Sequence, residues 1–165
     1  MRNFIIFGHK QHGKDTACEY LEDKYGIKFA SSSLFSCQLF LFEKMKAEGY
    51  GYQTVEECFA DRVNHRKYWY EAIRDFNVPD KSRLGKLLFD RHAIYCGIRD
   101  KEEFDSLKAD GLIHLAIFID ASGRLPKEDP ESMKMDIEDA DIVITNNGTL
   151  EQFYEKLDRL MMQLL

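Results

Sequence analysis

The chain has 165 residues, with 29 acidic and 23 basic side chains and a formal net charge of −6. This length predicts one folded domain, residues 1–165, with a substantial core. The negative balance argues against a protein that binds nucleic-acid duplexes by neutralising phosphates. The apolar runs are far shorter than the roughly 20 residues that cross a bilayer. We therefore expect neither nucleic acid nor a membrane as a partner.

The cysteines and the N-terminus indicate where the protein resides. Cys18, Cys37, Cys58 and Cys96 are widely spaced and form no C-x-x-C pair. This pattern favours reduced thiols that pack as small side chains over zinc or disulfide chemistry. The first residues run directly into an apolar segment and a glycine-containing loop, without the features of a signal peptide. Together these observations predict a cytoplasmic protein.

Short apolar runs alternate with helical patterns along the chain. An apolar run at 3–7 predicts a strand, and the helical spacing of Ala17, Tyr20 and Leu21 predicts a helix from residue 14 to Gly26. A second strand is expected at 27–30, followed by mostly helical patterns over 34–90 with breaks at 49–51 and 77–80. Further strands are expected at 93–98, 113–119 and 141–145, with a helix at 101–110. The prolines and charges of 121–138 predict an exposed, mobile loop.

Capping residues mark three helix starts. The serines at 31–33 precede a helix near residue 34, Asp100 with Glu103 opens the next, and Thr149 with Gln152 forms a capping-box pattern. The apolar stripe of the last helix consists of Leu150, Phe153, Leu157, Leu160 and Met161. Continuous apolar strands that alternate with helical patterns indicate a parallel sheet covered on both faces. We therefore predict a three-layer α/β fold with a five-stranded parallel sheet.

The segment between the first strand and the first helix matches a phosphate-binding loop, G-x-x-x-x-G-K. It consists of Gly8, His9, Lys10, Gln11, His12, Gly13, Lys14, Asp15 and Thr16. Such a loop turns its backbone N–H groups toward a polyphosphate, and Lys14 reaches the β- and γ-phosphates of ATP. The alternative is a glycine-rich turn without a ligand, but the position between a strand and a helix favours the phosphate loop.

The end of this loop departs from the usual pattern, because Asp15 replaces the hydroxyl residue that normally contacts Mg²⁺. A carboxylate beside phosphates is tolerated where it faces the metal or its water shell, so we expect Asp15 or Thr16 near Mg²⁺. His9 and His12 are either ATP contacts or solvated spacers of the loop.

The G-K-D-T ending, together with segments 61–73, 94–100 and 140–149, resembles the P-loop kinases of small phosphorylated substrates, and especially the bacteriophage deoxynucleoside monophosphate kinases. Phosphomevalonate kinases share the G-K-D ending. The resemblance implies a P-loop kinase domain with a helical monophosphate-binding region at about 34–90 and a lid at about 121–138. It also implies host cytoplasm as the location for a phage-encoded protein.

On the acceptor side, Arg62, Arg66 and Trp69 recur at helical spacing, so that two guanidinium groups and an indole can share one face. Such a face can hold a nucleotide, since arginine binds phosphate and an aromatic ring stacks on a base. Equally, Trp69 can be a core residue. Ser31 and Ser32 are candidates for hydrogen bonds to the acceptor, with a simple helix cap as the alternative.

Other site residues follow from the resemblance. Arg99 comes after the third strand, where related kinases place an arginine on the acceptor phosphate or the transferring group; a salt bridge to Asp100, Glu102 or Glu103 is the alternative. The predicted lid contains Arg124, Lys127 and Lys134. Asn147 and Gly148, in the turn after the fifth strand, correspond to the turn that packs against the adenine of ATP, although Asn-Asn-Gly also suits a plain turn. Asp120 is an alternative metal ligand.

These features predict transfer of the γ-phosphoryl group of MgATP to a deoxynucleoside 5′-monophosphate, with Lys14, Arg99 and Arg124 as the catalytic cations. Dephospho-CoA-like and phosphomevalonate-like acceptors remain open, as does a noncatalytic nucleotide-binding regulator. A guanine-specific N-K-x-D element is missing from the sequence, which argues against a nucleotide-operated switch. The expected partners are small nucleotides, and the choice between monomer and homodimer stays open.

Overall fold

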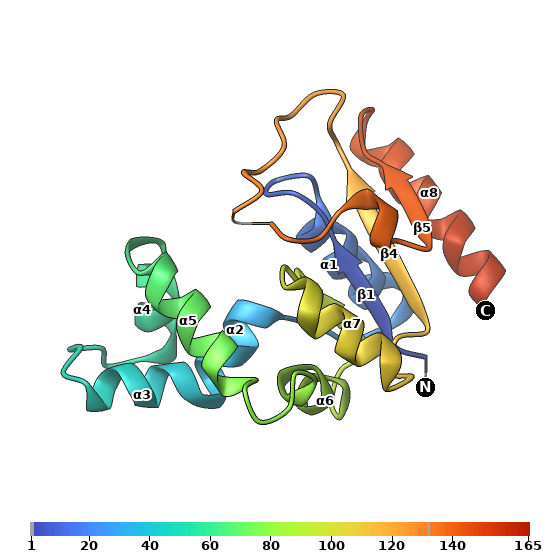
Figure 1. The fold of residues 1–165 in the computed structure, drawn as a ribbon. Coiled ribbons are helices and arrows are strands. Elements are labelled where there is room, and N and C mark those ends of the chain that lie inside the picture. Colours follow the sequence, from blue (N-terminus) through green and yellow to red (C-terminus); the bar gives the residue numbers. More distant parts are fainter. Residues whose placement is uncertain (1, 132) are drawn as a thin grey trace.

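The computed structural model describes residues 2–131 and 133–165 and has a five-stranded parallel sheet at its centre (Figure 1). The strands are β1 (Phe4–Phe7), β2 (Phe29–Ser31), β3 (Ile94–Cys96), β4 (Leu115–Asp120) and β5 (Ile142–Thr145). Their order in the sheet is β2-β3-β1-β4-β5, and every neighbouring pair is parallel. The predicted α/β class and sheet are therefore confirmed, with β1 in the middle.

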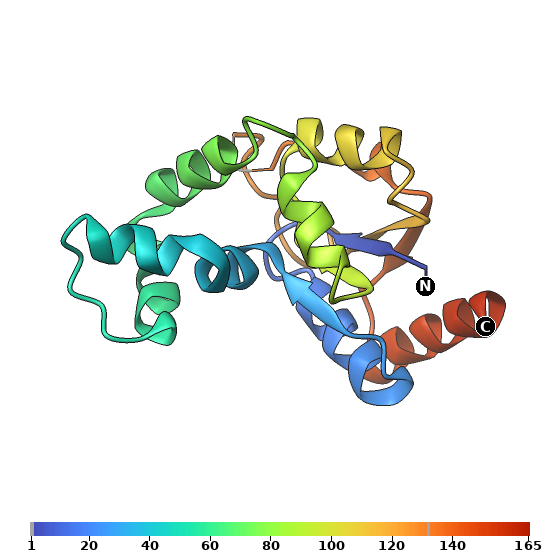
Figure 2. The ribbon, with the colours of Figure 1, turned by 90° about the horizontal axis from the view of Figure 1, so that it is seen from below.

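Helices cover both faces of the sheet. α1 (Lys14–Tyr25) and α8 (Leu150–Leu164) lie on one face, and α6 (Arg83–Phe89) and α7 (Lys101–Ala109) lie on the other (Figure 2). Side chains of β1 alternate between two cores, because Phe4 and Ile6 pack with α1 and α8, whereas Ile5 and Phe7 pack with α6 and α7. Burial on both faces explains why the strands are continuous apolar runs.

A helical arm projects from the sheet between β2 and α6 (Figures 1 and 2). It consists of α2 (Ser32–Ser36), the π-helical turn η1 (Cys37–Leu41), α3 (Phe42–Ala47), α4 (Val55–Ala60), the 3₁₀ turn η2 (Asp61–Asn64) and α5 (Arg66–Phe76). The arm has a core of its own, made by Cys37, Leu41, Met45, Cys58, Trp69 and Ala72. It can therefore hold its shape while it projects from the sheet.

Two capping predictions had different outcomes. Thr149 and Gln152 form the expected reciprocal capping box at α8. Asp100 caps α7 through the Glu102 N–H, 3.1 Å away, but the predicted partner Glu103 does not take part. Instead, its carboxyl accepts a hydrogen bond from the Tyr95 hydroxyl at 2.8 Å, in a position where only 3% of Glu103 is exposed. Asp100 therefore caps α7 as predicted, whereas Glu103 takes no part in the cap because its side chain is buried against β3.

Two further predictions, both about side-chain burial, also had different outcomes. All four cysteines are free and buried, as expected of packing groups. In the stripe of α8, Leu150 is 55% exposed, so the buried stripe begins only at Phe153. No helix within 2–131 and 133–165 is long and apolar enough to cross a membrane.

The segment 121–138, called the lid segment below, is not the freely exposed loop that its composition predicts. Met133 and Met135 are 5% and 3% exposed and belong to the core between the sheet and α7. The segment then enters a short 3₁₀ turn, η3 (Ile137–Asp139). The proline and charge content of the segment predicts exposure, but two buried methionines are enough to hold a loop against a core.

Candidate functional site

The loop between β1 and α1 has the tight backbone that phosphate binding requires. A Cβ atom on Gly8 would lie 2.6 Å from the Ile119 carbonyl oxygen, and one on Gly13 would lie 2.5 Å from the Asn146 amide nitrogen. Gly13 has φ of 108°, and Gln11 also has a positive φ, 65°. Both glycines are therefore required by close packing, and the loop curls at the N-terminus of α1, where backbone N–H groups attract anions.

Lys14, Asp15 and Thr16 form the first turn of α1, directly beside the end of β3. The Lys14 stem passes over Gly97, where an added Cβ would lie 3.4 Å from its Cε atom. Among the hydrogen bonds and ion pairs found within 2–131 and 133–165, none engages the Lys14 ammonium group. The Cys96 thiol donates to the Asp15 carboxylate at 3.4 Å. The turn therefore presents a cation and a carboxylate side by side.

His12 has a structural position that the sequence did not reveal. It is fully buried, its Nδ1 accepts a hydrogen bond from the Ala121 N–H at 3.0 Å, and its Nε2 lies 2.9 Å from the Pro126 carbonyl oxygen. This geometry defines a neutral imidazole that donates from Nε2. The interpretation of His12 as a solvated spacer was therefore wrong. Its ring connects the phosphate loop to the lid segment at Ala121 and at Pro126.

Asn146, the first residue of the Asn-Asn-Gly turn after β5, braces the same loop from the other side. Its side chain donates to the His12 carbonyl at 3.0 Å, and its own N–H donates to the Asp120 carbonyl at 2.7 Å. The signal for it was a polar residue directly after a buried strand. Asn147 accepts from the Gly123 N–H at 3.0 Å, and Arg124 donates from Nε to the Asn146 carbonyl at 2.8 Å. The turn after β5 therefore holds the start of the lid segment.

Arg99 lies after β3, at the carboxyl end of the sheet, and reaches the lid segment. Its Nη1 contacts both carboxylate oxygens of Glu128, at 2.7 and 2.8 Å. The three carboxylates that the sequence suggested as partners are engaged elsewhere: Asp100 caps α7, Glu102 pairs with Lys81, and Glu103 binds Tyr95. A partner 29 residues along the chain was invisible to local pattern reading.

Arg62 and Arg66 lie where the helical arm faces the phosphate loop. Arg62 donates to the Phe59 carbonyl at 2.9 Å, and its guanidinium group stacks 3.8 Å from the centre of the Phe59 ring. Burial and then the neighbouring charge of Arg66 lower the pKa of Arg62, whereas the Asp15 carboxylate opposes this shift. Arg62 therefore lies within electrostatic range of the phosphate loop, next to a second cation, Arg66.

Trp69 lies in the core of the arm, with 5% exposed and an edge-on contact to Phe59 at 6.4 Å between ring centres. The sequence left open whether Trp69 stacks on a base or lies in the core, and the structure shows a buried core residue. Its Nε1–H has no hydrogen-bond partner among the described residues. Ser31 caps α2 by accepting from the Leu34 N–H at 3.2 Å, and the Ser32 hydroxyl donates to the Gly97 carbonyl at 3.4 Å. Both serines therefore border the end of β3.

The residues of the loop suit Mg²⁺ that arrives with nucleotide phosphates. Within 2–131 and 133–165 no group of three or more His, Cys, Asp or Glu side chains could hold a metal by itself. Mg²⁺ needs fewer, because it keeps several waters and takes one or two protein oxygens together with phosphate oxygens. Asp15 has an exposed carboxylate, and Thr16 a hydroxyl, on the first turn of α1. These hard oxygen donors fit the metal.

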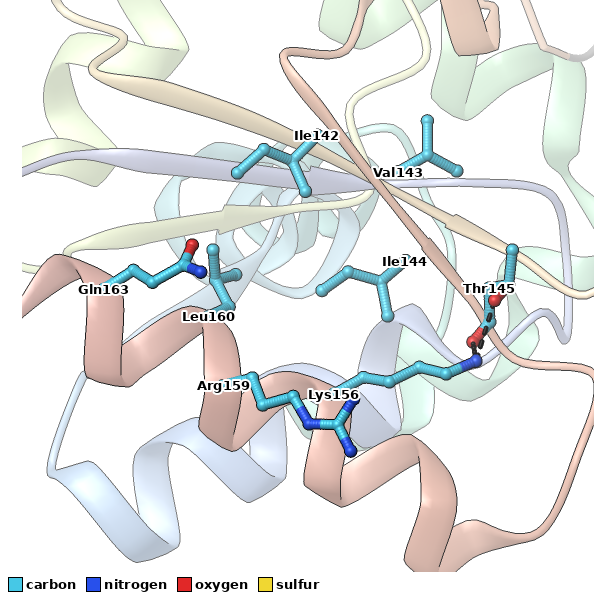
Figure 3. Close-up of a pocket in the computed structure, with 8 residues that line it drawn as sticks. All are labelled: Ile142, Val143, Ile144, Thr145, Lys156, Arg159, Leu160 and Gln163. Carbon is cyan, nitrogen blue, oxygen red and sulfur yellow. Dashed lines mark hydrogen bonds between the residues drawn. The ribbon is translucent and has the colours of Figure 1, made fainter.

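A groove lies away from the phosphate loop, at the outer edge of the sheet (Figure 3). This groove between β5 and α8 has a volume of about 250 Å³ and is lined by aliphatic and polar side chains in equal number. Lys156 extends along it and donates to the Thr145 carbonyl at 2.9 Å. No residue of 8–16 lines the groove. Convergent polar groups identify a site better than volume does, so the phosphate loop is the candidate site.

Comparison with known proteins supports the α/β fold described above. No protein-family model and no curated protein sequence matches the chain. The solved structure of TT1252 from Thermus thermophilus is similar, with a TM-score of 0.54 and 16% identity over 99% of this chain and 98% of that one. A dephospho-CoA kinase from Campylobacter jejuni is similar too, with a TM-score of 0.52 and 14% identity over the same shares.

The chain shares its fold with this kinase. At this identity the similarity establishes the fold alone. It agrees with the strand order and with the position of the phosphate loop after the central strand β1.

Proposed function

We propose that the protein is an ATP-dependent kinase that phosphorylates a small phosphate-bearing acceptor, a deoxynucleoside 5′-monophosphate. The observation that carries this proposal is the Lys14 ammonium group, which emerges from the phosphate loop with no partner among the described residues and has arginines on neighbouring elements. Cations on elements that border a phosphate loop suit a substrate that brings several negative charges.

The strand order supports separate places for donor and acceptor. The helical arm with Arg62 and Arg66 follows β2, at one edge of the sheet, whereas the turn with Asn147 and Gly148 follows β5 at the other edge. The phosphate loop follows the central β1. In this proposal the base of ATP binds near the turn after β5, the acceptor binds below the arm, and the phosphates meet at the loop.

The proposed reaction needs positioning and charge neutralisation rather than a general base. The acceptor phosphate is already a nucleophile near neutral pH, and the transferring phosphoryl group distributes charge over its oxygens. Lys14 and Arg99 neutralise that charge, while Arg124, held at the turn after β5, supports the donor side. Bound Mg²⁺ supplies further neutralisation of the phosphate oxygens. The lid segment excludes water, which would otherwise accept the phosphoryl group.

A dephospho-CoA-like acceptor is the second candidate, favoured by the name of the Campylobacter protein with the same fold. Phosphomevalonate-like acceptors are a further candidate for phosphoryl transfer from ATP to a small phosphorylated molecule. The Arg62 and Arg66 pair favours an acceptor whose phosphate group is the reacting end, because two adjacent guanidinium groups bind a dianion better than they bind a hydroxyl.

One screen tests the proposal: ATP and Mg²⁺ with each ribo- and deoxyribonucleoside monophosphate and with dephospho-CoA, while ADP release and product identity are measured. We expect a nucleoside diphosphate from at least one monophosphate. Arg66→Ala should then raise the acceptor KM at least about tenfold with little change in the ATP KM. Arg74→Ala, an exposed arginine on the same helix, is the matched control. If no monophosphate stimulates ADP release, the proposed function is wrong.

A further inference from the structure

Glu128 of the lid segment places its carboxylate on the phosphate loop. Oε2 accepts a hydrogen bond from the Lys10 backbone N–H at 2.9 Å, and both oxygens contact Arg99 at 2.7 and 2.8 Å. The side chain is 15% exposed, although glutamate in a charged loop ordinarily extends into water. A carboxylate that joins a loop N–H to an arginine makes the contacts that a phosphate oxygen would make there.

The backbone beside Glu128 is held as firmly as its side chain. The Glu128 N–H donates to Nδ1 of His9 at 3.0 Å, and two residues earlier the Pro126 carbonyl accepts from His12 at 2.9 Å. Between Pro126 and Glu128 the lid segment therefore contacts the loop at three points. The hollow beneath it, lined by His9, Asp120 and Lys127 among others, has a volume of about 40 Å³. A hollow of this size has room for water.

We infer that Glu128 is an internal competitor for phosphate: its carboxylate occupies an anion position of the loop and must leave before a nucleotide's phosphates bind. This inference rests on the proposed function in that the anion is a polyphosphate. Arg99 and the Lys10 N–H exchange one anionic partner for another, so opening the lid leaves neither group unpaired. The affinity for nucleotide is reduced by the fraction of molecules in which the carboxylate occupies the loop.

Three variants separate this competition from a general effect of charge. Glu128→Gln removes the charge at nearly constant size. Glu128→Asp keeps the charge but shortens the side chain by one methylene group, and because His9 fixes the backbone, the carboxylate no longer reaches both the Lys10 N–H and Arg99. Glu131→Gln removes an exposed charge from the same segment and is the matched control. Binding of MgATP and of inorganic triphosphate to each variant is measured by isothermal titration calorimetry.

We expect Glu128→Gln and Glu128→Asp to bind both ligands about tenfold more tightly than the wild type, as for a carboxylate that occupies the loop in about nine of ten molecules. Glu131→Gln should stay within about twofold. If Glu128→Asp binds like the wild type, or Glu128→Gln like Glu131→Gln, the competition is refuted while the proposed function stands. Tighter binding without any kinase product would refute the proposed function alone. Failure of every variant, wild type included, to bind either ligand would refute both.

Discussion

Replacement of Glu103 by glutamine tests how a buried carboxyl affects the stability of the sheet. Glu103 is 3% exposed, and its Oε1 accepts a hydrogen bond from the Tyr95 hydroxyl at 2.8 Å. Burial raises the pKa of Glu103 from 4.5 to about 8, against the opposing effect of the Tyr95 hydrogen bond and with a smaller contribution from Asp100. The folded protein therefore holds this carboxyl in its protonated form at neutral pH.

The sign of the pH effect follows from the proton count. Between pH 4.5 and about 8 the folded chain keeps the proton of Glu103, whereas the unfolded chain has lost it. Folding then binds a proton, so the contribution of Glu103 to stability falls as pH rises. The slope approaches about 1.4 kcal/mol per pH unit, which amounts to about 4 kcal/mol between pH 5 and 8. Above the pKa of Glu103 in the folded protein, a further rise in pH no longer lowers the free energy of unfolding through this group.

The assay is urea unfolding at pH 5, 6, 7 and 8 for the wild type, Glu103→Gln and Glu102→Gln. The free energy of unfolding of the wild type should fall relative to that of Glu103→Gln by about 4 kcal/mol across the series, because the amide cannot titrate. Glu102 is exposed and adjacent in sequence, so Glu102→Gln should retain the wild-type dependence. Parallel pH curves for the wild type and Glu103→Gln would refute the assignment of a protonated, buried Glu103.

Substitutions at three further positions test the site and the arm. Lys14→Ala should lower kcat by at least about two orders of magnitude with an unchanged circular dichroism spectrum, since this ammonium group has no partner among the described residues; near-normal turnover would argue against the kinase mechanism. Asp15→Asn should raise the Mg²⁺ concentration for half-maximal rate, and an unchanged dependence would direct attention to Thr16 and Asp120. Trp69→Ala should destabilise the protein by about 3 to 5 kcal/mol, a fall in Tm on the order of 10 °C, whereas Trp69→Phe should cost much less because it fills most of the space and removes an unpaired N–H. An acceptor KM raised in Trp69→Phe at unchanged Tm would instead mean that the indole touches substrate.

The sequence alone was enough for the fold class and for the position of the glycine-containing loop between β1 and α1. Both depend on short-range patterns: apolar runs of strand length, helical spacing, and glycines at set positions between β1 and α1. A parallel strand buried on both faces cannot tolerate polar residues, so its composition is visible without a structure. The capping box of α8 belongs here too, because its two partners are three residues apart.

The tertiary structure decided which polar groups of the site face one another. Glu128 meets the Lys10 N–H across 118 residues, and Asn146 meets the His12 carbonyl across 134. Trp69 could occupy either side of α5 by its spacing, and only the core of the arm determined which side is buried. Glu103 has the sequence position of a capping partner, but its carboxyl accepts a hydrogen bond from the Tyr95 hydroxyl of β3 instead. Local patterns specify backbone conformation within a few residues, but the partner of a charged side chain depends on which distant elements the sheet order brings together.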